Sequence, residues 1–182
     1  MRLLAIALVM TLAAPATAEP EPKVDPGGTL NPDEMSLDRM RANIAEGRTD
    51  MTTCAAGYMM TKSGQHGMAR DTFTACAEAG YTGAMTWMGQ LENNGLGAPE
   101  NPDAAAEWDR RAAEAGDPIG KFNYGLDKLR GRGTALDRDG GRRLIDEAAE
   151  AGLEIAQRLR GADYDMDEVT PDADNWKYAP LF

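Results

Sequence analysis

The sequence has few of the residues that most catalytic and metal centres require. Its 182 residues include one histidine, His66, and two cysteines. One imidazole without nearby ligands does not make a metal site, and no Cys-x-x-Cys pair is present for redox chemistry. Nothing in the spacing supports a Ser/His/Asp triad around His66, so we interpret it as a solvated turn residue. We expect a protein that is not an enzyme and that binds no metal or cofactor.

Basic residues and long apolar runs are also scarce. The chain has 19 Lys and Arg against 30 Asp and Glu, a formal net charge of −11. Such a chain is repelled by nucleic acid phosphates and anionic lipid head groups, although it would attract a basic protein. After the N-terminus no stretch is apolar enough to cross a bilayer. We therefore expect no nucleic acid partner and no stable membrane insertion.

The first 18 residues are predicted to be an export signal. Arg2 supplies a positive charge, residues 3–14 form the apolar core, and Ala16-Thr17-Ala18 is a small-residue cleavage site. Cleavage there places Glu19 at the start of the mature chain and predicts a periplasmic or secreted protein. Residues 19–35 contain four prolines and few apolar side chains, which predicts a flexible linker.

The rest of the chain is organised around a repeat. Ala77-Glu78-Ala79-Gly80 returns at residues 113–116 and again at 149–152, with a constant step of 36 residues. This period is typical of stacked helix–turn–helix units that cannot bury their apolar faces alone. We predict an all-α repeat domain over residues 36–161, followed by an acidic and aromatic tail, residues 162–182, that caps the stack or binds a partner. The expected helices cover about 36–46, 49–62, 67–79, 83–93, 101–115, 119–130, 137–151 and a last segment from 153.

The second copy carries a specific motif. It reads Ala84-x-x-x-Met88-Gly89-x-x-Glu92-x-x-Gly95-x-Gly97 and continues with Ala, Trp and Gly at regular positions. This motif resembles the Sel1-like repeat, a relative of the tetratricopeptide repeat. The resemblance implies an α-solenoid of antiparallel helix pairs with a concave face, and a role as adaptor or regulator through protein contacts. Exported bacterial members are similar to envelope regulators and to cysteine-rich secreted proteins.

The chain departs from the family pattern at packing positions. Glu92 and Lys128 stand where the family usually has Tyr. Between the copies, Trp108 and Leu144 are predicted to fill space, because small alanines on the same helices let neighbouring helices approach closely.

The two cysteines, Cys54 and Cys76, are predicted to form a disulfide. They are the only cysteines, and the export signal places them in an oxidising compartment. Their spacing also resembles that of the cysteine-rich members, which join the first and second helix of one repeat.

The same relatives suggest an alternative function, because some carry a β-lactamase label. Lys62-Ser63-Gly64 is similar to one element of β-lactam and peptidoglycan hydrolases, but the nucleophile motif Ser-x-x-Lys is missing. A calcium loop is a further alternative, since Asp163, Asp165, Asp167 and Asp174 match part of its pattern. We favour chance for the first match and a solvated acidic turn for the second.

A binding surface is predicted on the first helices of copies two and three. The repeat leaves some positions on these helices free to differ, and such positions can determine specificity. They include Trp87, Gln90, Asn123 and Asp127. Trp87 is a candidate anchor for a protein partner of unknown identity, and packing against the neighbouring repeat is the alternative reading for this side chain.

Overall fold

The computed structural model describes residues 33–169 of the chain. The predicted signal, most of the predicted linker and the end of the predicted tail lie outside this range. Within it the secondary structure is helical throughout, without a strand, which confirms the all-α prediction. None of the helices in residues 33–169 is long and apolar enough to span a bilayer.

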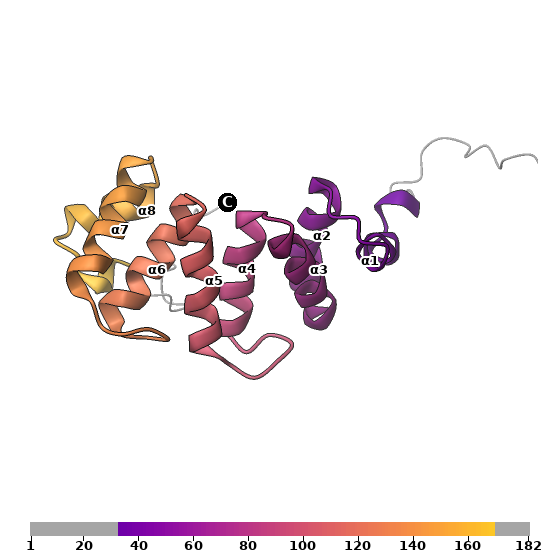
Figure 1. The fold of residues 1–182 in the computed structure, drawn as a ribbon, viewed down its shortest axis with the longest axis horizontal. Coiled ribbons are helices and arrows are strands. Elements are labelled where there is room, and N and C mark those ends of the chain that lie inside the picture. Colours follow the sequence, from indigo (N-terminus) through magenta and orange to yellow (C-terminus); the bar gives the residue numbers. More distant parts are fainter. Residues whose placement is uncertain (1–32, 170–182) are drawn as a thin grey trace, which may run out of the picture. The chain divides into compact units, whose positions relative to one another are not determined.

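The helices follow one another with short connections, as Figure 1 shows. Two short 3-10 helices lie at the ends of the described range, and α-helices occupy the rest. In chain order they are η1 (Asp33–Met35), α1 (Leu37–Ala45), α2 (Met51–Lys62), α3 (His66–Glu78), α4 (Thr82–Asn93), α5 (Pro102–Glu114), α6 (Pro118–Arg130), α7 (Arg138–Glu150), α8 (Glu154–Gly161) and η2 (Met166–Val169).

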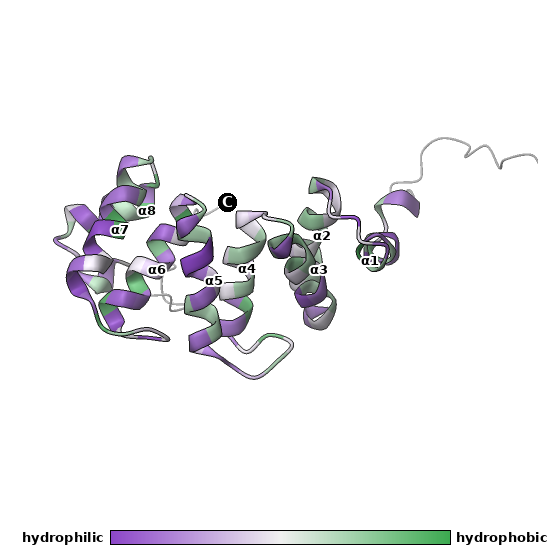
Figure 2. Ribbon diagram, in the orientation of Figure 1, coloured by the Kyte–Doolittle hydropathy of each residue, from purple (hydrophilic) through white to green (hydrophobic). Residues whose placement is uncertain are grey.

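The repeat copies correspond to helix pairs. Copy one is α2 with α3, copy two is α4 with α5, and copy three is α6 with α7; we call the two helices of each copy A and B. Every helix from α1 to α8 packs against the next along the chain. The A helix α4 is mostly apolar or neutral, whereas the B helices α5 and α7 carry more hydrophilic residues (Figure 2).

The start of each B helix in copies two and three is fixed by the same cap. Asn101 accepts a hydrogen bond from the Ala104 N–H at 3.1 Å, and Asp137 accepts one from the Gly140 N–H at 2.9 Å. Both side chains satisfy N–H groups that have no partner inside the helix. The cap positions are 36 residues apart, so the period in the sequence is a period in local structure.

The turn between helices A and B brings each copy close to the copy before it. Gly133 has a φ of +65°, and a Cβ there would lie 2.0 Å from the Pro102 carbonyl oxygen at the start of α5. Gly97 is its equivalent, with a φ of +77° and a Cβ position 2.9 Å from the carbonyl carbon of His66 at the start of α3. Only glycine allows both the left-handed backbone and the close contact.

The disulfide joins the two helices of copy one. Cys54 on α2 is bonded to Cys76 on α3, as predicted. Both residues are buried in the core cluster that also contains Phe73, Met60 and Leu91. The bond therefore holds together the copy whose sequence matches the repeat least well.

The two residues predicted to fill the space between copies are only partly buried. Trp108 is partly buried, with the Arg111 guanidinium 4.3 Å from its ring centre, and Leu144 is only half-buried. The fully buried side chain of α7 is the next residue, Ile145, with 0% exposure. One residue along a helix turns the side chain by about 100°. Ile145 faces Gly125 of its own copy, whereas Leu144 lines the pocket between α5, α6 and α7, so the residue predicted between the copies is the less buried of the two.

The two departures from the family pattern take part in ion pairs. Glu92 is buried and pairs with Arg70, which joins copy two to copy one. Lys128 lies 3.0 Å from Asp137, the cap of α7, with its ammonium 5.2 Å from the Tyr124 ring centre. At these positions charge pairing replaces the packing of an aromatic ring.

The ends of the repeat stack are covered by short segments. At the N-terminal end, η1 holds the last residues of the predicted linker and packs against α1, and α1 packs against α2 and α3. At the C-terminal end, residues 162–169 belong to the predicted tail. There the Tyr164 hydroxyl donates a hydrogen bond to Asp146 Oδ1 at 2.6 Å, and Tyr164 and Met166 pack against the core of α7 and α8.

We predict that Gly133→Ala lowers the free energy of unfolding by several kcal/mol. The added methyl group would overlap the Pro102 carbonyl and also force an alanine into left-handed backbone. Gly116→Ala is the matched control, because Gly116 has a φ of +89° with no atom within 4 Å of the added Cβ. The control should cost only about 1–2 kcal/mol. Equal losses for the two variants in urea unfolding would contradict the close contact between copies.

A candidate binding face on helices α4 and α6

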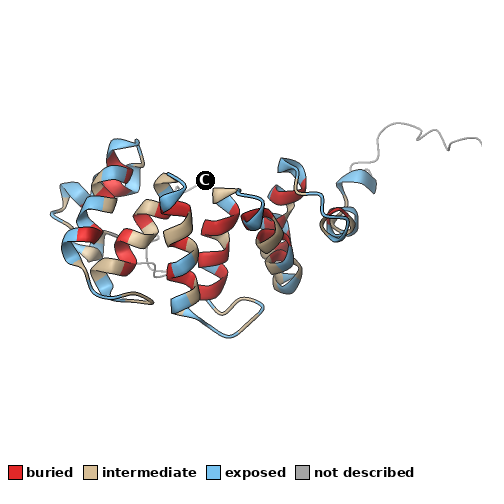
Figure 3. Cartoon of the chain, viewed as in Figure 1, coloured by how far each residue is buried: buried red, intermediate tan, exposed pale blue. Residues whose placement is uncertain are grey.

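The A helices of copies two and three lie beside each other. α4 packs against α6 as well as against α5, whereas α5 and α7 make no comparable contact. Between copies two and three the A helices are therefore closer together than the B helices, which makes this the inner side of that part of the stack. Buried residues recur along α4, α5 and α6, and exposed residues remain between them (Figure 3).

Trp87 on α4 is part of an aromatic cluster. Its ring stacks on Phe73 with centres 5.7 Å apart and meets Tyr58 edge-on at 5.4 Å. It packs against the core cluster of copies one and two, as the alternative reading proposed. Trp87 is nevertheless only partly buried, and it lines an apolar pocket of about 240 Å3 with Tyr58 and Tyr81.

A second pocket continues from Trp87 across α4 to α6. It has a volume of about 260 Å3 and is lined by Thr86, Trp87, Gln90, Ile119 and Asn123. We call this surface the inner groove. Gln90 is exposed, and 49% of Ile119 is exposed. The structure thus brings together three of the four residues predicted for binding.

A third pocket, of about 170 Å3, adjoins the inner groove and shares Gln90 and Asn123 with it. We call it the acid pocket because two aspartates, Asp109 on α5 and Asp127 on α6, line it. Its other polar residues include Asn93 at the end of α4 and the pair Arg130 and Arg132. Asp127, the fourth predicted residue, therefore lies in the same region as the other three.

Both aspartates of the acid pocket are buried. Asp109 is 2% exposed and Asp127 is 6% exposed. Asp109 Oδ1 accepts a hydrogen bond from Asn123 Nδ2 at 3.0 Å. Asp127 Oδ2 is buried without a hydrogen-bond partner in the described part of the chain. Buried carboxylates usually have hydrogen-bond partners, so an unpartnered carboxylate oxygen lowers the stability of the fold unless a donor from outside the chain binds to it.

The aspartates occupy positions that hold apolar side chains elsewhere in the repeat. Asp109 is equivalent to Phe73 in copy one and Ile145 in copy three, each 36 residues away. Asp127 is equivalent to Leu91 in copy two. Phe73, Leu91 and Ile145 are 2%, 0% and 0% exposed. The apolar core of residues 33–169 forms separate clusters on the two sides of these aspartates.

Burial changes the acidity of both groups. Loss of hydration raises the pKa of Asp109 to about 7. The hydrogen bond from Asn123 lowers this pKa, whereas the negative charges of Asp127 and Asp117 raise it further. Loss of hydration also raises the pKa of Asp127 to about 7, while the positive charges of Arg130 and Arg132 lower it. Both carboxyls thus change charge near neutral pH.

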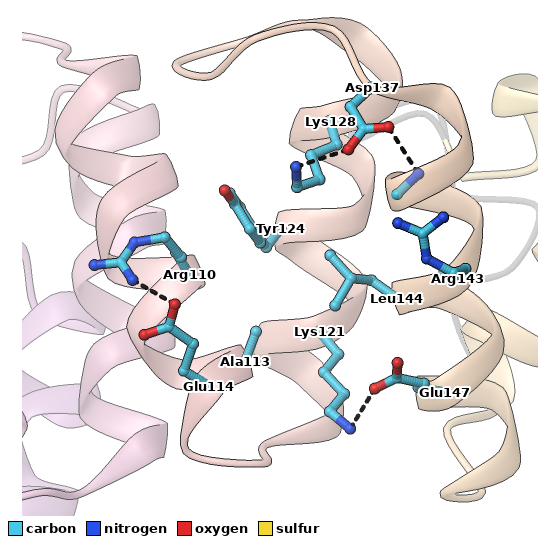
Figure 4. Close-up of a pocket in the computed structure, with 11 residues that line it drawn as sticks. Arg110, Ala113, Glu114, Lys121, Tyr124, Lys128, Asp137, Arg143, Leu144 and Glu147 are labelled. Carbon is cyan, nitrogen blue, oxygen red and sulfur yellow. Dashed lines mark hydrogen bonds and ion pairs between the residues drawn. The ribbon is translucent and has the colours of Figure 1, made fainter.

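The outer side of the stack has a larger pocket with a different character. About 330 Å3 in volume, it lies between α5, α6 and α7 (Figure 4). Beside Arg143, whose positive charge lowers the pKa of Asp137, six of its charged residues are arranged in pairs: Lys121 with Glu147 at 2.7 Å, Lys128 with Asp137 at 3.0 Å, and Arg110 with Glu114. Because these groups already have partners within the chain, we do not take this pocket as the candidate site.

The residues of the two weaker sequence matches have local roles. Ser63 donates a hydrogen bond to the Met60 carbonyl at 3.0 Å and accepts one from Gln65, and Lys62 lies 5.5 Å from the Tyr58 ring centre. In the acidic turn, Asp165 accepts a hydrogen bond from the Asp167 N–H. Asp174, the other end of the calcium pattern, lies outside the described residues.

The sequence interpretation placed His66 in a solvated turn, but the structure places it in helix α3. It is the first residue of α3, is partly buried, and has a buried Nδ1 without a partner in residues 33–169. Gln65, the residue before it, makes no side-chain capping hydrogen bond to the helix.

The sequence interpretation missed Asp109 and Asn93. Both lie in the acid pocket, and Asp109 is the more buried of its two carboxylates. The signal was present: aligning the copies at 36 residues places Asp109 in a column with Phe73 and Ile145. A single charged residue in an apolar column is a departure that repeat alignment can detect.

Comparison with known proteins supports the fold. The chain is similar to a Sel1 repeat protein from Oxalobacter formigenes, with 24% identity, a TM-score of 0.57, and coverage of 69% of this chain and 97% of that one. It is also similar to a protective antigen of uropathogenic Escherichia coli that displays an SLR fold, with 21% identity and a TM-score of 0.51. That match covers 76% of this chain and 35% of the antigen. No family model and no curated protein sequence matches the chain.

We predict that Asp109→Asn stabilises the protein more at pH 8 than at pH 5. The raised pKa means that the folded state holds a proton near pH 5 to 6 that the unfolded state has released. Stability from this group is therefore complete below the unfolded value of about 4 and is lost as the pH rises through 7. Asparagine is neutral throughout, so its advantage at pH 8 should be about 2–4 kcal/mol.

Thermal and urea unfolding at both pH values measures this difference. Asp103→Asn is the control, because Asp103 is exposed on the same helix. A constant difference between Asp109→Asn and the wild type from pH 5 to pH 8 would show that Asp109 keeps its ordinary acidity.

Proposed function

Because residues 33–169 form a Sel1-like repeat solenoid, we propose that this protein is a periplasmic protein-interaction module that binds a partner through its inner groove. The periplasmic location rests on the export signal predicted in residues 1–18. The role as adaptor or regulator of an envelope process rests on the resemblance of the repeats. Binding without catalysis is the activity that this fold supports best.

The observation that carries the proposal is the continuity of the inner side. The apolar pocket at Tyr58, the inner groove and the acid pocket adjoin one another through shared residues, Trp87 and then Gln90 and Asn123. Protein interfaces commonly combine aromatic anchors with polar groups that fix orientation. An extended segment of a partner could therefore contact aromatic, aliphatic and acidic regions in sequence.

The acidic chain favours a basic partner. The formal net charge of −11 would speed the encounter with a positively charged protein and make association weaken with salt. The two aspartates of the acid pocket are a place on the inner side where a basic group of the partner could bind. Hydrolysis of a β-lactam or peptidoglycan, the alternative, gains no support, because Ser63 is engaged in local hydrogen bonds.

The structure changes how the proposal is best tested. Trp87→Ala would remove a ring that stacks on Phe73, so a loss of binding could reflect a damaged core. Asn123→Arg would remove the hydrogen bond to Asp109. Gln90 and Ile119 are better positions, because both are exposed in the inner groove.

We predict that a photoreactive benzoylphenylalanine at position 90 crosslinks a protein partner in the cells that produce this protein. The same group at position 136 is the control, since Leu136 is 58% exposed and lies outside the inner groove. Ile119→Arg should reduce the adduct formed from position 90 roughly tenfold, because a charged side chain would obstruct the groove. Leu136→Arg should leave it unchanged.

Adducts of equal yield from positions 90 and 136 would contradict the proposal. So would an adduct from position 90 that persists at full yield when Ile119→Arg is present. Circular dichroism and melting of each variant establish that the fold is intact before the yields are compared.

A further inference from the structure

The acid pocket is built to accept hydrogen bonds. Its volume of about 170 Å3 is below the roughly 300–1,000 Å3 of sites that enclose a whole drug-sized molecule. It can therefore hold one side chain or a small polar group. The groups that reach it come from three helices: Asn93 from α4, Asp109 from α5 and Asp127 from α6.

Two acceptor atoms of residues that line this pocket are unpartnered within residues 33–169. Asp127 Oδ2 and Asn93 Oδ1 are both buried, and neither receives a hydrogen bond from residues 33–169. Leaving a buried acceptor unpaired costs about 1–3 kcal/mol, and more when the acceptor is charged. Two such atoms in one pocket indicate that a hydrogen-bond donor completes the site.

The charges of the pocket favour a cation as that donor. Asp109 and Asp127 are the buried acidic groups, and Arg130 and Arg132 are the basic groups nearby. Arg132 is already paired with Glu100 at 2.6 Å and donates to the Asn93 carbonyl oxygen at 3.3 Å. Glu100 lies outside the pocket, so its pairing with Arg132 engages one of the two basic groups away from Asp109 and Asp127.

The number of acceptors distinguishes between the possible cations. A primary ammonium group has three N–H donors that point in different directions, whereas a guanidinium presents its donors in a planar fork that suits one carboxylate. Acceptors on three separate helices match the ammonium group. The residues that the structure describes contain no cluster of three metal-binding side chains, and the pocket itself supplies two carboxylates.

We propose that the acid pocket binds the ammonium group of a lysine side chain presented by the partner protein, with Asp127, Asp109 and Asn93 as its acceptors. This inference rests on the proposed function, because the lysine belongs to the segment that lies in the inner groove. The lysine stem would pass Gln90 and Asn123, which the two pockets share. A small amine of the periplasm has the same ammonium chemistry and is the alternative source.

The test is an NMR titration of the isotope-labelled full chain with the acetylated and amidated tripeptide Gly-Lys-Gly. The expected result is a saturable shift of the Asn93 and Asn123 side-chain amide signals. The same peptide with an acetylated lysine is the matched ligand control, because it keeps the stem and loses the charge. Butylammonium, which has the amine and the stem without a peptide backbone, represents the small-amine source.

Asp127→Asn should weaken peptide binding about tenfold, whereas Asp103→Asn should leave it unchanged. Binding should also weaken roughly tenfold from pH 8 to pH 6, as carboxyls of pKa about 7 become protonated. Of the neighbouring charges, Asp117 raises the pKa of Asp109, and Arg130 and Arg132 lower the pKa of Asp127. A variant that merely disturbed packing would not remove this pH dependence.

Four outcomes would overturn the inference. They are equal binding of the acetyl-lysine peptide, equal binding of an arginine peptide, full affinity of Asp127→Asn, and butylammonium binding as tight as the peptide. The last outcome would assign the pocket to small amines. Crosslinking from position 90 that succeeds while the lysine titration fails would leave the proposed function intact. A titration that succeeds without crosslinking would keep the acid pocket as an amine site and remove the partner protein from both proposals.

Discussion

The packing of each helix pair depends on one close contact between a glycine and a single side chain of the facing helix. A Cβ added to Gly57, Gly89 or Gly125 on helix A would lie 2.6, 2.8 or 2.9 Å from an atom of the residue opposite on helix B. Those facing residues are Phe73, Asp109 and Ile145. The side chain on helix B must therefore tolerate close packing against helix A and the loss of most of its hydration. Phenylalanine and isoleucine meet this requirement, and a carboxylate meets it only at a cost.

That cost explains why the candidate site lies between copies two and three. Asp109 interrupts the apolar column of the B helices, and Asp127 replaces an apolar residue on α6 within the same pocket. The apolar core is divided at this place, and polar acceptors remain without partners. We infer that this interface gives up stability for the proposed binding role, because two buried carboxylates stand where the other copies have apolar side chains. The aromatic cluster around Trp87 supplies the apolar half of the same inner side.

Much of this architecture is encoded in the sequence period. The 36-residue step predicts the helix pairs and the turns at Gly97 and Gly133, and the two cysteines predict their bond. The side-chain neighbours of the site were harder to predict. Whether Trp87 packs or binds depends on Phe73 and Tyr58, which lie on other helices. Leu144 and Ile145 differ by one residue, and periodicity alone does not determine the rotation of a helix to that accuracy. The burial of Asp109 required the three-dimensional stack.

The central claim is that Asp109 and Asp127 serve binding at the expense of stability, and the other copies provide the substitutions that test it. Asp109→Ile introduces the residue that copy three has at this position, and Asp127→Leu introduces the residue of copy two. The decisive measurement is urea unfolding of the double variant at pH 8. The account predicts a folded protein that is more stable than the wild type by about 1–4 kcal/mol, because buried carboxylates are replaced by apolar side chains that fit the same contact. A double variant that is less stable than the wild type would contradict it, since the two carboxylates would then support the fold itself.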